Sequence, residues 1–308
     1  MKVFVTGAGG FVGAAAVSSA LSAGHDVVAL VRPNGNRQRL DELGVVVAPV
    51  NLADVAELEA AMRHHRPDVI VHSAWSGVSN ASRHERLQIS DNVSAALSLV
   101  DAAAAAGVSK FIGIGSQAEY GLLSGKISET VLPVPTSLYG AAKLAVQVLA
   151  AQLCADAGID FAWLRLFSTY GPRDNPNWLI PSVIEQMLDG RRPMTTEGRQ
   201  LWDYLFIDDV ADAIRAVAES KQAVGIFNLG SGKPIAVRNI IEHIRDIAAP
   251  GLDLIFGEIP YKQGQIWHME ADTDRLNKLT GFVPQVELDE GLLRTIEWHK
   301  SKRSGEQC

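Results

Sequence analysis

Several features that define large classes of protein are missing from this sequence. Its 308 residues include only two cysteines, Cys154 and Cys308, which excludes a disulfide framework and a cysteine-rich metal site. The net charge is −7 and no segment is dense in lysine and arginine, so nucleic acid and anionic membranes are disfavoured as partners. We find no apolar run long enough to span a membrane and no secretory signal at the start. We therefore expect no transmembrane helix and a reducing, cytoplasmic location.

What remains is an ordinary globular composition, 47% hydrophobic and 20% charged, with material for one large domain or two modest ones. The first part of the chain alternates short apolar runs with helical stretches. Strands are expected at 2–7, 26–31, 44–50, 68–74, 110–116 and 160–167, and helices at 11–24, 53–65 and 139–158, with an alanine-rich helix ending at Gly107. This alternation predicts an α/β fold with a parallel sheet covered by helices on both faces.

The pattern changes after Phe167. Residues 168–177, STYGPRDNPN, have turn chemistry, and shorter mixed elements follow them. We expect a sheet domain formed by residues 1–167 together with about 204–232. A smaller, mixed substrate-binding lobe would be formed by about 168–203 and 233–308.

A glycine-rich turn follows the first expected strand. The segment TGAGGFVG places Gly7, Gly10 and Gly13 at regular intervals between a strand and a helix. In such a turn one glycine allows the tight bend, another lets the backbone approach a pyrophosphate, and the third allows close packing of helix and strand. The N-terminus of the helix adds N–H donors and a partial positive charge. This context predicts a dinucleotide-binding site, with a purely structural turn as the alternative.

The end of the second strand bears on which dinucleotide is bound. An acidic residue there would bind the ribose 2′-hydroxyl of NAD. The sequence instead reads ALVRPNGNRQRL, with no acidic residue before Asp41 and with Arg32 and Arg37 where a 2′-phosphate would lie. These residues favour NADP. NAD stays open as the alternative, because the two arginines can equally be solvent-exposed loop residues that bind no phosphate.

The segment YGAAK places Tyr139 and Lys143 four residues apart, on one face of a helix. A phenol normally titrates near pH ~10, and a neighbouring ammonium together with a positive nicotinamide ring is expected to lower that pKa. Such a tyrosine can exchange a proton with a carbonyl oxygen, and Ser116 at the end of a strand can hold the same oxygen. Tyr-x-x-x-Lys alone is common by chance. Together with the glycine turn and the strand-end serine, it predicts a catalytic set of Ser116, Tyr139 and Lys143.

These features together resemble the extended short-chain dehydrogenase/reductase family, whose members include nucleotide-sugar epimerases, dehydratases and reductases. The resemblance covers nearly the whole chain. It includes VIVHSA (69–74), DNVSAALSLVDAA (91–103), LRLFSTYGP (164–172), LWDYLFIDDVADAI (201–214) and EADTDRLNKLTGFVPQVELDEGL (270–292). It implies a Rossmann-type doubly wound sheet, a smaller mixed C-terminal substrate domain and a homodimer.

The resemblance also implies roles for individual residues. By position, Asn92 would brace the active-site backbone, and Asn51 replaces the Asp of an adenine contact in the segment NL (51–52). The expected cofactor-binding residues are Gly7, Gly10, Phe11, Val12, Gly13, Arg32, Arg37, Asn51, Leu52, Ser73, Ala74, Asn92, Tyr139, Lys143 and Phe167. The expected substrate-binding residues are Trp75, Ser116, Gln117, Asn177, Trp178 and Arg199. No metal site is expected.

The stretch GIGSQAEYG (113–121) bears on the reaction. In nucleotide-sugar 4,6-dehydratases this strand end resembles Thr-Asp-Glu-Val-Tyr-Gly, whose Asp and Glu are the acid and the base of the elimination. The matching residues here are Gln117 and Ala118, and neither can act as acid or base. Glu119 is one position further on, where alternation is expected to turn it away as a polar loop-side carboxylate. Elimination is therefore disfavoured, and hydride transfer at a carbonyl or carbinol remains.

Two hydride-transfer reactions fit. A 4-epimerase oxidises C4 of a nucleotide sugar and reduces its other face with a retained NAD, whereas a 4-ketoreductase takes hydride once from fresh NAD(P)H. The segments GSQAEYG, QLWDYLFIDDVA and PYKQGQIWHMEAD resemble the 4-ketoreductases of deoxysugar pathways. We expect a 4-ketoreductase that acts on a nucleotide-diphosphate sugar. The alternatives are a 4-epimerase and, from another class, a non-catalytic dinucleotide sensor.

Other polar residues have simpler interpretations. Trp202 stands where many epimerases carry an arginine for a nucleotide phosphate, so Arg173, Arg199 and Lys262 are alternative cations, or plain surface charges. His72 is expected to be a hydrogen-bonded structural histidine. The paired Asp208 and Asp209 are expected to stabilise the start of a helix.

Overall fold

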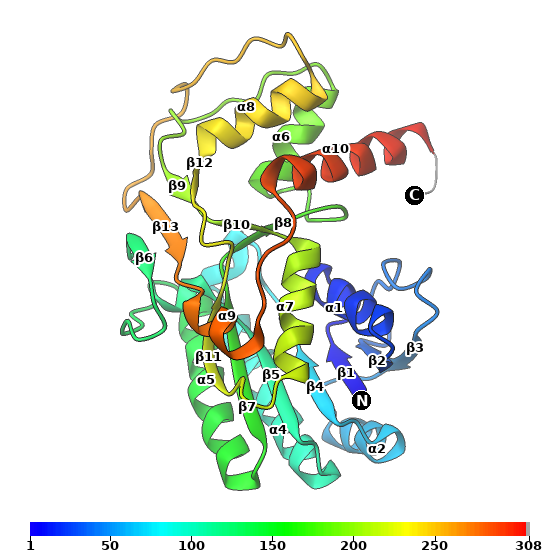
Figure 1. The fold of residues 1–308 in the computed structure, drawn as a ribbon. Helices are drawn as coiled ribbons and strands as arrows, with labels where there is room; N and C mark the ends of the chain where they lie inside the picture. The colour runs from blue at the N-terminus through cyan, green and yellow to red at the C-terminus, as the bar shows by residue number, and fades with distance from the viewer. Residues whose placement is uncertain (306–308) are drawn as a thin grey trace.

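The computed structural model describes residues 1–305, so Cys308 lies outside the described residues. Its centre is a seven-stranded sheet in which every pairing is parallel (Figure 1). The strands are β1 (Lys2–Thr6), β2 (Asp26–Val31), β3 (Val46–Pro49), β4 (Val69–His72), β5 (Lys110–Ser116), β7 (Asp160–Leu166) and β11 (Gly225–Leu229). Their order is β11-β7-β5-β4-β1-β2-β3, which reverses between β1 and β4. The expected α/β fold with a doubly wound sheet is confirmed.

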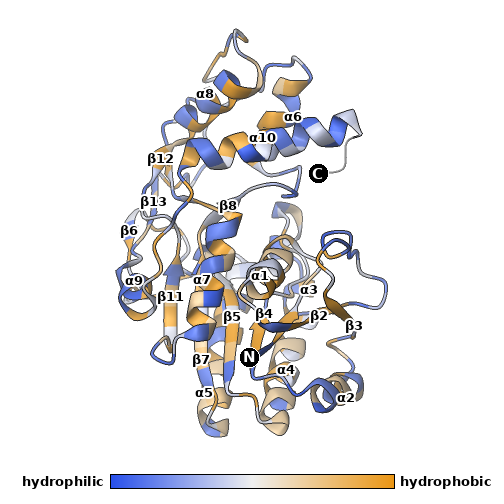
Figure 2. Ribbon diagram, turned by 45° about the vertical axis from the view of Figure 1, so that its right-hand side comes forward, coloured by the Kyte–Doolittle hydropathy of each residue, from blue (hydrophilic) through white to orange (hydrophobic). Residues whose placement is uncertain are grey.

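Helices cover both faces of this sheet. α1 (Phe11–Ser22) and α7 (Ile207–Glu219) lie on one face, and α2 (Val55–His65), α4 (Val93–Ala106) and α5 (Leu138–Ala157) lie on the other. Strand β1 shows how the sequence produces two cores: Val3 and Val5 join the core on the α1 side, whereas Phe4 joins the core on the α4 side. Because both faces are buried, the strands are continuous hydrophobic runs, which Figure 2 shows as orange bands.

The chain beyond residue 167 builds a smaller mixed region. Strands β8 (Ser168–Tyr170) and β10 (Tyr204–Phe206) pair with each other, and a second small sheet has the order β12 (Ile235–Ala236), β9 (Leu201–Trp202), β13 (His268–Ala271), β6 (Gly125–Ile127). Helices α6 (Leu179–Leu188), α8 (Val237–Ala248) and α10 (Leu288–Ser304) pack together at the top of Figure 1, and α9 (Asp274–Thr280) lies near β11. β11 lies in the main sheet beside β7. β6, however, comes from the first part of the chain, and the division into two domains stays a prediction.

Helix α5 corrects the expectation about apolar runs. Among the described residues it is the one helix long and apolar enough to cross a membrane by length and composition alone. In the fold, however, α5 packs against α4, β5 and β7, and it carries the buried side chains of Tyr139 and Lys143. Its apolar composition is that of a helix packed against a sheet.

His72 occupies the end of β4 and is structural, as expected. Its Nδ1 is hydrogen-bonded to Thr6 Oγ1 at 2.8 Å, and Thr6 Oγ1 also accepts the backbone N–H of Ala74 at 3.3 Å. Burial, with a smaller contribution from the charge of Lys143, lowers the pKa of His72 to about 3. The folded protein therefore holds a neutral imidazole at this position throughout the neutral range.

We predict that His72 makes the fold sensitive to acid. Below its ordinary pKa, about 6.5, the histidine takes up a proton in the unfolded chain but not in the folded one. Its contribution to stability is therefore present above that pH and is lost as the pH falls towards 3. Urea unfolding measures the free energy of unfolding of the wild type and of His72→Asn at each pH. The difference between the two proteins should decrease by up to about 2 kcal/mol from pH ~7.5 to pH ~5. The exposed-histidine variant His84→Asn should show no such narrowing. A gap that does not change with pH would mean that His72 has the same pKa in the folded protein as in the unfolded chain.

Candidate active site

The glycine turn between β1 and α1 is shaped by close backbone approaches. Gly7 has φ +64°, and a Cβ there would lie 2.6 Å from Ala74 Cα. A Cβ on Gly13 would lie 2.2 Å from the carbonyl oxygen of Gly7. Gly10 is the exposed N-cap residue of α1 and provides no side-chain cap, and the first turn of α1 has no acidic residue. The N–H groups and dipole of α1 thus stay available to an anion, and the turn fits a pyrophosphate.

The end of β4 and the start of α1 lie beside the glycine turn. Ala74 follows β4 and meets Gly7, and the N–H of Ser73 bonds the Thr6 carbonyl at 3.3 Å. Phe11 and Val12, both half-buried, open α1. Together these residues line the C-terminal edge of β1 and β4, the point of the sheet where ligands bind in such folds.

Asn92 braces the loop that follows β4. Its Oδ1 accepts the backbone N–H of Ser76 at 2.7 Å, and its Nδ2 donates to the Ser76 carbonyl at 3.2 Å. The same amide lies 3.3 Å from the carbonyls of Leu87 and Gln88 in the short helix α3 (Leu87–Ser90). These contacts hold the loop after β4 against α3.

The three candidate catalytic residues come together where β5 meets the first turns of α5. Ser116 is the last residue of β5, and Tyr139 and Lys143 face it from α5; all three are buried, with 4–8% of each residue exposed. Gly140 permits this approach, because a Cβ there would lie 2.3 Å from the carbonyl oxygen of Ala118. The Lys143 ammonium donates to the carbonyl of Ile114 at 2.5 Å.

The expectation for this set was a tyrosine whose pKa is lowered by its ammonium neighbour together with the positive ring of a bound nicotinamide. In the protein alone, burial raises the pKa of Tyr139, opposed by the Ser116 side chain and by the Arg83 charge. Burial also lowers the pKa of Lys143 to about 7. In the folded protein the phenol is therefore protonated at neutral pH, because desolvation disfavours the charged form of each group.

Two further side chains complete this cluster. The Trp75 ring lies 3.8 Å from Lys143 Nζ and edge-on to the Tyr139 ring at 6.1 Å, and its indole N–H donates to Gln88 Oε1 at 2.8 Å. Arg83, in the short 3₁₀ helix η1 (Asn80–His84), places its guanidinium carbon 5.0 Å from the centre of the Tyr139 ring. Sequence reasoning named Trp75 but missed Arg83, which belongs to no motif and reaches the site only through the fold of residues 75–90.

The turn after β5 overturns one expectation. Residues 117–119 form a 3₁₀ turn, η2 (Gln117–Glu119), and Glu119 is fully buried, not a polar loop-side carboxylate. Its carboxylate forms an ion pair with Arg165, Nε to Oε2 at 2.7 Å, and accepts the indole N–H of Trp163 at 3.0 Å. Gln117 and Ala118 remain half-buried at the edge of the set. Because the chain turns, the alternation of an extended strand does not apply here.

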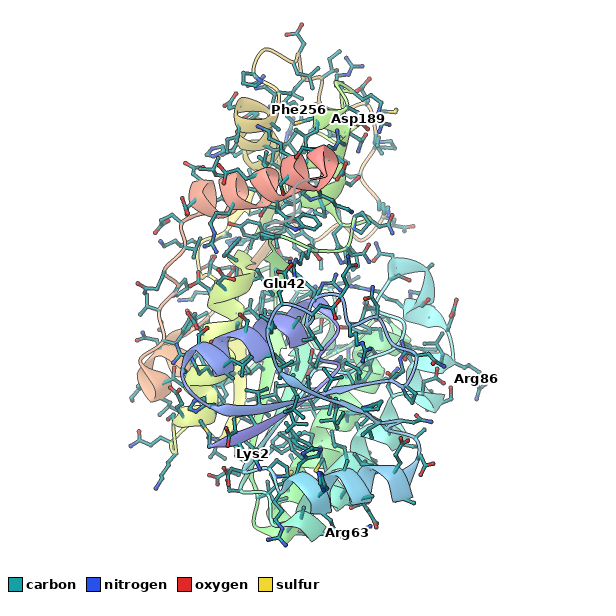
Figure 3. The ribbon with its side chains drawn as sticks, turned by 90° about the vertical axis from the view of Figure 1, so that its right-hand side faces the viewer. Lys2, Glu42, Arg63, Arg86, Asp189 and Phe256 are labelled. Carbon is teal, nitrogen blue, oxygen red and sulfur yellow. The ribbon has the colours of Figure 1, made fainter. Side chains whose placement is uncertain are left out.

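The loop after β2 contributes an arginine that sequence reasoning did not choose. Arg32 and Arg37 are exposed, as candidates for a 2′-phosphate should be. Arg39, two residues further on, donates to the Gly9 carbonyl at 3.1 Å and to the Arg173 carbonyl at 2.6 Å. It ties the glycine turn to the loop after β8. Arg173 in turn pairs at 3.3 Å with Glu42, which Figure 3 labels between the sheet and the upper helices.

Three expected cofactor residues, Asn51, Leu52 and Phe167, lie outside the segments described so far. Asn51 is exposed and its Oδ1 accepts the backbone N–H of Ala53 at 3.1 Å, so that it shapes the turn into α2, while Leu52 packs against the core. Phe167 is buried beside Tyr120, with ring centres 6.4 Å apart.

The expected substrate residues of the mixed region are not joined to the catalytic set. Asn177 is exposed, Trp178 is the half-buried N-cap of α6, and Arg199 pairs on the surface with Glu197 at 3.0 Å. Lys262 is also exposed. Within residues 1–305, no hydrogen bond, ion pair or ring contact links Asn177, Trp178 or Arg199 to Ser116, Tyr139 or Lys143.

Two other features are structural. Asp209 accepts the backbone N–H groups of Gln285 and Val286 at 2.9 and 3.0 Å, and Asp208 pairs with Arg294, so these aspartates anchor the C-terminal segment as well as starting α7. No cluster of metal-ligating side chains occurs in the described part of the chain.

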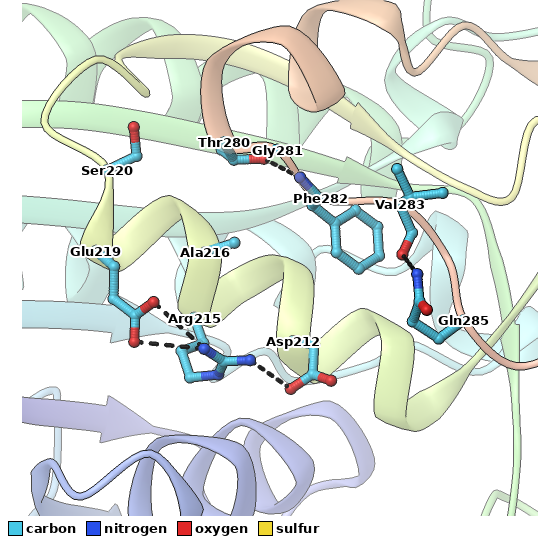
Figure 4. A pocket seen from close by; sticks show the side chains of 10 residues that line it. All are labelled: Asp212, Arg215, Ala216, Glu219, Ser220, Thr280, Gly281, Phe282, Val283 and Gln285. Carbon is cyan, nitrogen blue, oxygen red and sulfur yellow. Dashed lines mark hydrogen bonds and ion pairs between the residues drawn. The ribbon is translucent and has the colours of Figure 1, made fainter.

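A surface hollow lies between α7 and residues 280–285 (Figure 4). It is lined by Asp212, Arg215, Ala216, Glu219, Ser220, Thr280, Gly281, Phe282, Val283 and Gln285. Arg215 already bonds Asp212 and Glu219 there, so its charge is satisfied within α7. None of the candidate catalytic residues lines this hollow.

Comparison with known proteins identifies the family. A model of the NAD dependent epimerase/dehydratase family matches residues 3–230. The chain belongs to this family.

Relatives within the epimerase/dehydratase family match over their full length. A dTDP-glucose 4,6-dehydratase of Streptomyces griseus is 29% identical, with 98% of this chain and 95% of that protein aligned. The structure of a UDP-glucose 4-epimerase of Thermotoga maritima with UDP-glucose has a TM-score of 0.88 and 26% identity, covering 98% of this chain and 100% of that one. A UDP-glucuronic acid 4-epimerase of Bacillus cereus with UDP-glucuronic acid and NAD has a TM-score of 0.86 and 26% identity, with 98% and 100% covered. The expected membership of the extended short-chain dehydrogenase/reductase type is thereby confirmed.

Proposed function

We propose that the protein reduces the C4 keto group of a nucleotide-linked, deoxygenated sugar with hydride from NAD(P)H. The observation that carries this proposal is the turn after β5. The positions of a dehydratase acid and base hold Gln117 and Ala118, and the one nearby carboxylate, Glu119, is buried in an ion pair with Arg165. Removal of water across C5–C6 needs an acid and a base that this turn does not offer.

The catalytic set suits proton donation to a carbonyl. The nicotinamide of the dinucleotide, when bound, supplies the hydride. Ser116 and Tyr139 donate hydrogen bonds to the C4 oxygen of the substrate, and the phenol proton passes to that oxygen as it becomes an alkoxide. Burial favours the protonated phenol that this direction requires. Lys143, four residues along α5, orients the nicotinamide ribose and stabilises the phenolate that forms.

We further propose NADP as the preferred dinucleotide, with NAD as the alternative. Arg32 and Arg37 are exposed after β2, where an acidic residue would select NAD. The glycine turn is held beside this loop by Arg39. A reductase also fits a dinucleotide that exchanges between turnovers.

The second candidate function is 4-epimerisation with a retained NAD. It is supported by the structural neighbours named above, two 4-epimerases at TM-scores of 0.88 and 0.86. Trp202 speaks against it, because this half-buried residue of β9 stands where many epimerases hold a phosphate-binding arginine. A non-catalytic dinucleotide sensor is the third candidate, and the complete catalytic set disfavours it.

We also propose that the protein is a cytoplasmic homodimer that buries the outer face of α5. Val148 and Leu149, which are adjacent on this helix, are 56% and 45% exposed. A second copy packed on α4 and α5 would cover them.

An assay with a panel of nucleotide sugars distinguishes the three functions. We expect a 4-keto nucleotide sugar to consume one equivalent of NADPH, followed by absorbance of the reduced nicotinamide. Interconversion of two nucleotide sugars without added dinucleotide would instead establish the epimerase. Dinucleotide binding without turnover of any UDP-, GDP-, CDP- or dTDP-sugar would establish the sensor.

Tyr139→Phe should lower turnover by about 10²–10⁴-fold, because the carbonyl oxygen loses its proton donor. The dinucleotide affinity should stay nearly unchanged, since the ring and its contact with Trp75 remain. Tyr204→Phe, at a half-buried tyrosine outside the catalytic set, serves as the control and should keep its activity. Near-native turnover of Tyr139→Phe would remove this residue from the mechanism.

Arg32→Ala should weaken NADPH binding by about tenfold or more, the usual effect of losing a charge-assisted bond to phosphate. NADH binding should change little, because NADH has no 2′-phosphate. Fluorescence titration of both dinucleotides measures the two affinities. Arg63→Ala, an exposed arginine of α2, is the control for general charge effects. Equal losses for NADPH and NADH would argue that Arg32 does not read the 2′-phosphate.

A further inference from the structure

Glu119 lies directly beneath the catalytic set, and both of its oxygens are engaged. Oε1 accepts the backbone N–H of Ser116 at 2.8 Å and the indole N–H of Trp163 at 3.0 Å. Oε2 accepts Nε of Arg165 at 2.7 Å. Glu119 is 0% exposed and Arg165 is 1% exposed. A charge pair buried this deeply is costly to desolvate, so its presence beside an active site suggests that it has a function.

The glycines of GIGS create the space for this arrangement. A Cβ on Gly113 would lie 2.2 Å from the Trp163 ring, and a Cβ on Gly115 would lie 2.2 Å from the indole nitrogen and 2.5 Å from Glu119 Oε1. Without side chains at both positions, the indole lies flat against β5 and its N–H reaches the carboxylate. Strand, indole and carboxylate are thus packed as one unit.

The same carboxylate fixes the catalytic serine. Ser116 and Glu119 form a capping box at η2: the Ser116 hydroxyl accepts the N–H of Ala118 at 3.2 Å, and Glu119 accepts the N–H of Ser116. Since that hydroxyl acts as an acceptor towards the backbone, its proton stays available for donation to a substrate oxygen.

Glu119 also acts on Lys143. The groups beside this ammonium are the Ile114 carbonyl, the rings of Trp75 and Trp163, and the neutral His72. Among the described residues, Glu119 is the acidic group whose charge raises the pKa of Lys143, against the lowering by burial. The indole of Trp163 lies between them, 6.0 Å from Lys143 Nζ at its centre and bonded to Glu119.

We propose that Glu119 is a positioning residue of the active site. It fixes Ser116 through the capping box, and its buried negative charge favours the protonated form of Lys143 against the effect of burial. Arg165 is the counterion that allows this carboxylate to be buried. The inference rests on the proposed function for the roles of Ser116 and Lys143, but its electrostatic part concerns the protein alone.

The electrostatic part is tested by titrating Lys143 in the free protein with NMR of labelled lysine side chains, the signal being assigned by Lys143→Arg. Glu119→Gln keeps an acceptor for the Ser116 N–H and removes the charge. Glu119→Gln/Arg165→Met removes both buried charges at similar volume, so it guards against unfolding of the single variant. We expect the midpoint of Lys143 to fall by about one pH unit or more in Glu119→Gln, and by a smaller amount in the double variant, because removing Arg165 also removes a positive charge.

A matched control is Glu129→Gln, because this half-buried carboxylate accepts a backbone N–H from Asn228 at 2.8 Å but does not act on Lys143. Its Lys143 midpoint should match the wild type. An unchanged midpoint in the folded double variant overturns the electrostatic part, whether or not the protein is a reductase.

The positioning part is tested by turnover at a pH about one unit below the lowest Lys143 midpoint measured among the variants, where Lys143 is mostly charged in all of them. Glu119→Gln should recover most of the wild-type turnover there, because the glutamine still accepts the Ser116 N–H, whereas Glu119→Ala should stay low. Equal losses for Gln and Ala would show that Ser116 does not depend on this acceptor. Absence of dinucleotide binding by the wild type would instead overturn the proposed function and, with it, the positioning part.

Discussion

The active site depends on how closely the start of α5 can approach the turn after β5. That approach is set by Gly140, whose missing side chain lets the helix rest on the Ala118 carbonyl. Gly113 and Gly115 act in the same way on the inner side, where they let the Trp163 indole lie against the strand. If either contact were wider, Tyr139 and Lys143 would move away from Ser116. Three glycines thus set the geometry of a site in which none of them takes part chemically.

This close packing has an electrostatic consequence. Ionisable groups that are packed away from water lose the hydration that stabilises their charged forms. Burial therefore raises the pKa of Tyr139, which is charged when deprotonated, and lowers the pKa of Lys143, which is charged when protonated, to about 7. The remaining charges oppose these shifts, with Arg83 acting on the phenol and Glu119 on the ammonium. The pKa values of Tyr139 and Lys143 therefore depend on burial and on the charges of two residues outside the serine, tyrosine and lysine set.

Much of this arrangement can be read from the sequence. The alternation of apolar runs and helices predicted the parallel sheet, and strand 110–116 matches β5 in both of its ends. The spacing of Tyr139 and Lys143 placed them on one helix face, and local patterns of this kind survive because backbone geometry alone decides them. The predicted helix at 11–24 and the observed α1 differ only at the C-terminal end.

What the sequence did not predict depends on contacts between distant segments. Glu119 was expected to face a loop, but its position is decided by Arg165 and Trp163, more than 40 residues away in the chain. Arg83 and Arg39 reach the site through loops without a motif, so no local pattern distinguishes them from surface arginines. The sequence likewise shows the lysine four residues after Tyr139 but not the burial that raises the pKa of this phenol in the protein alone.

The buried pair of Glu119 and Arg165 also affects which reactions the turn after β5 can support. A dehydratase needs an ionisable acid and base that face the sugar, and the turn after β5 is where such side chains would stand. In this chain the only carboxylate of that turn is directed inward, where it is neutralised by Arg165 and bonded by Trp163 and the Ser116 backbone. To reach a substrate it would have to leave Arg165 buried without a partner, at a cost of about 3–5 kcal/mol. The same interaction that holds the Ser116 backbone therefore keeps this carboxylate away from a substrate, and this packing is the reason that we propose hydride transfer rather than elimination.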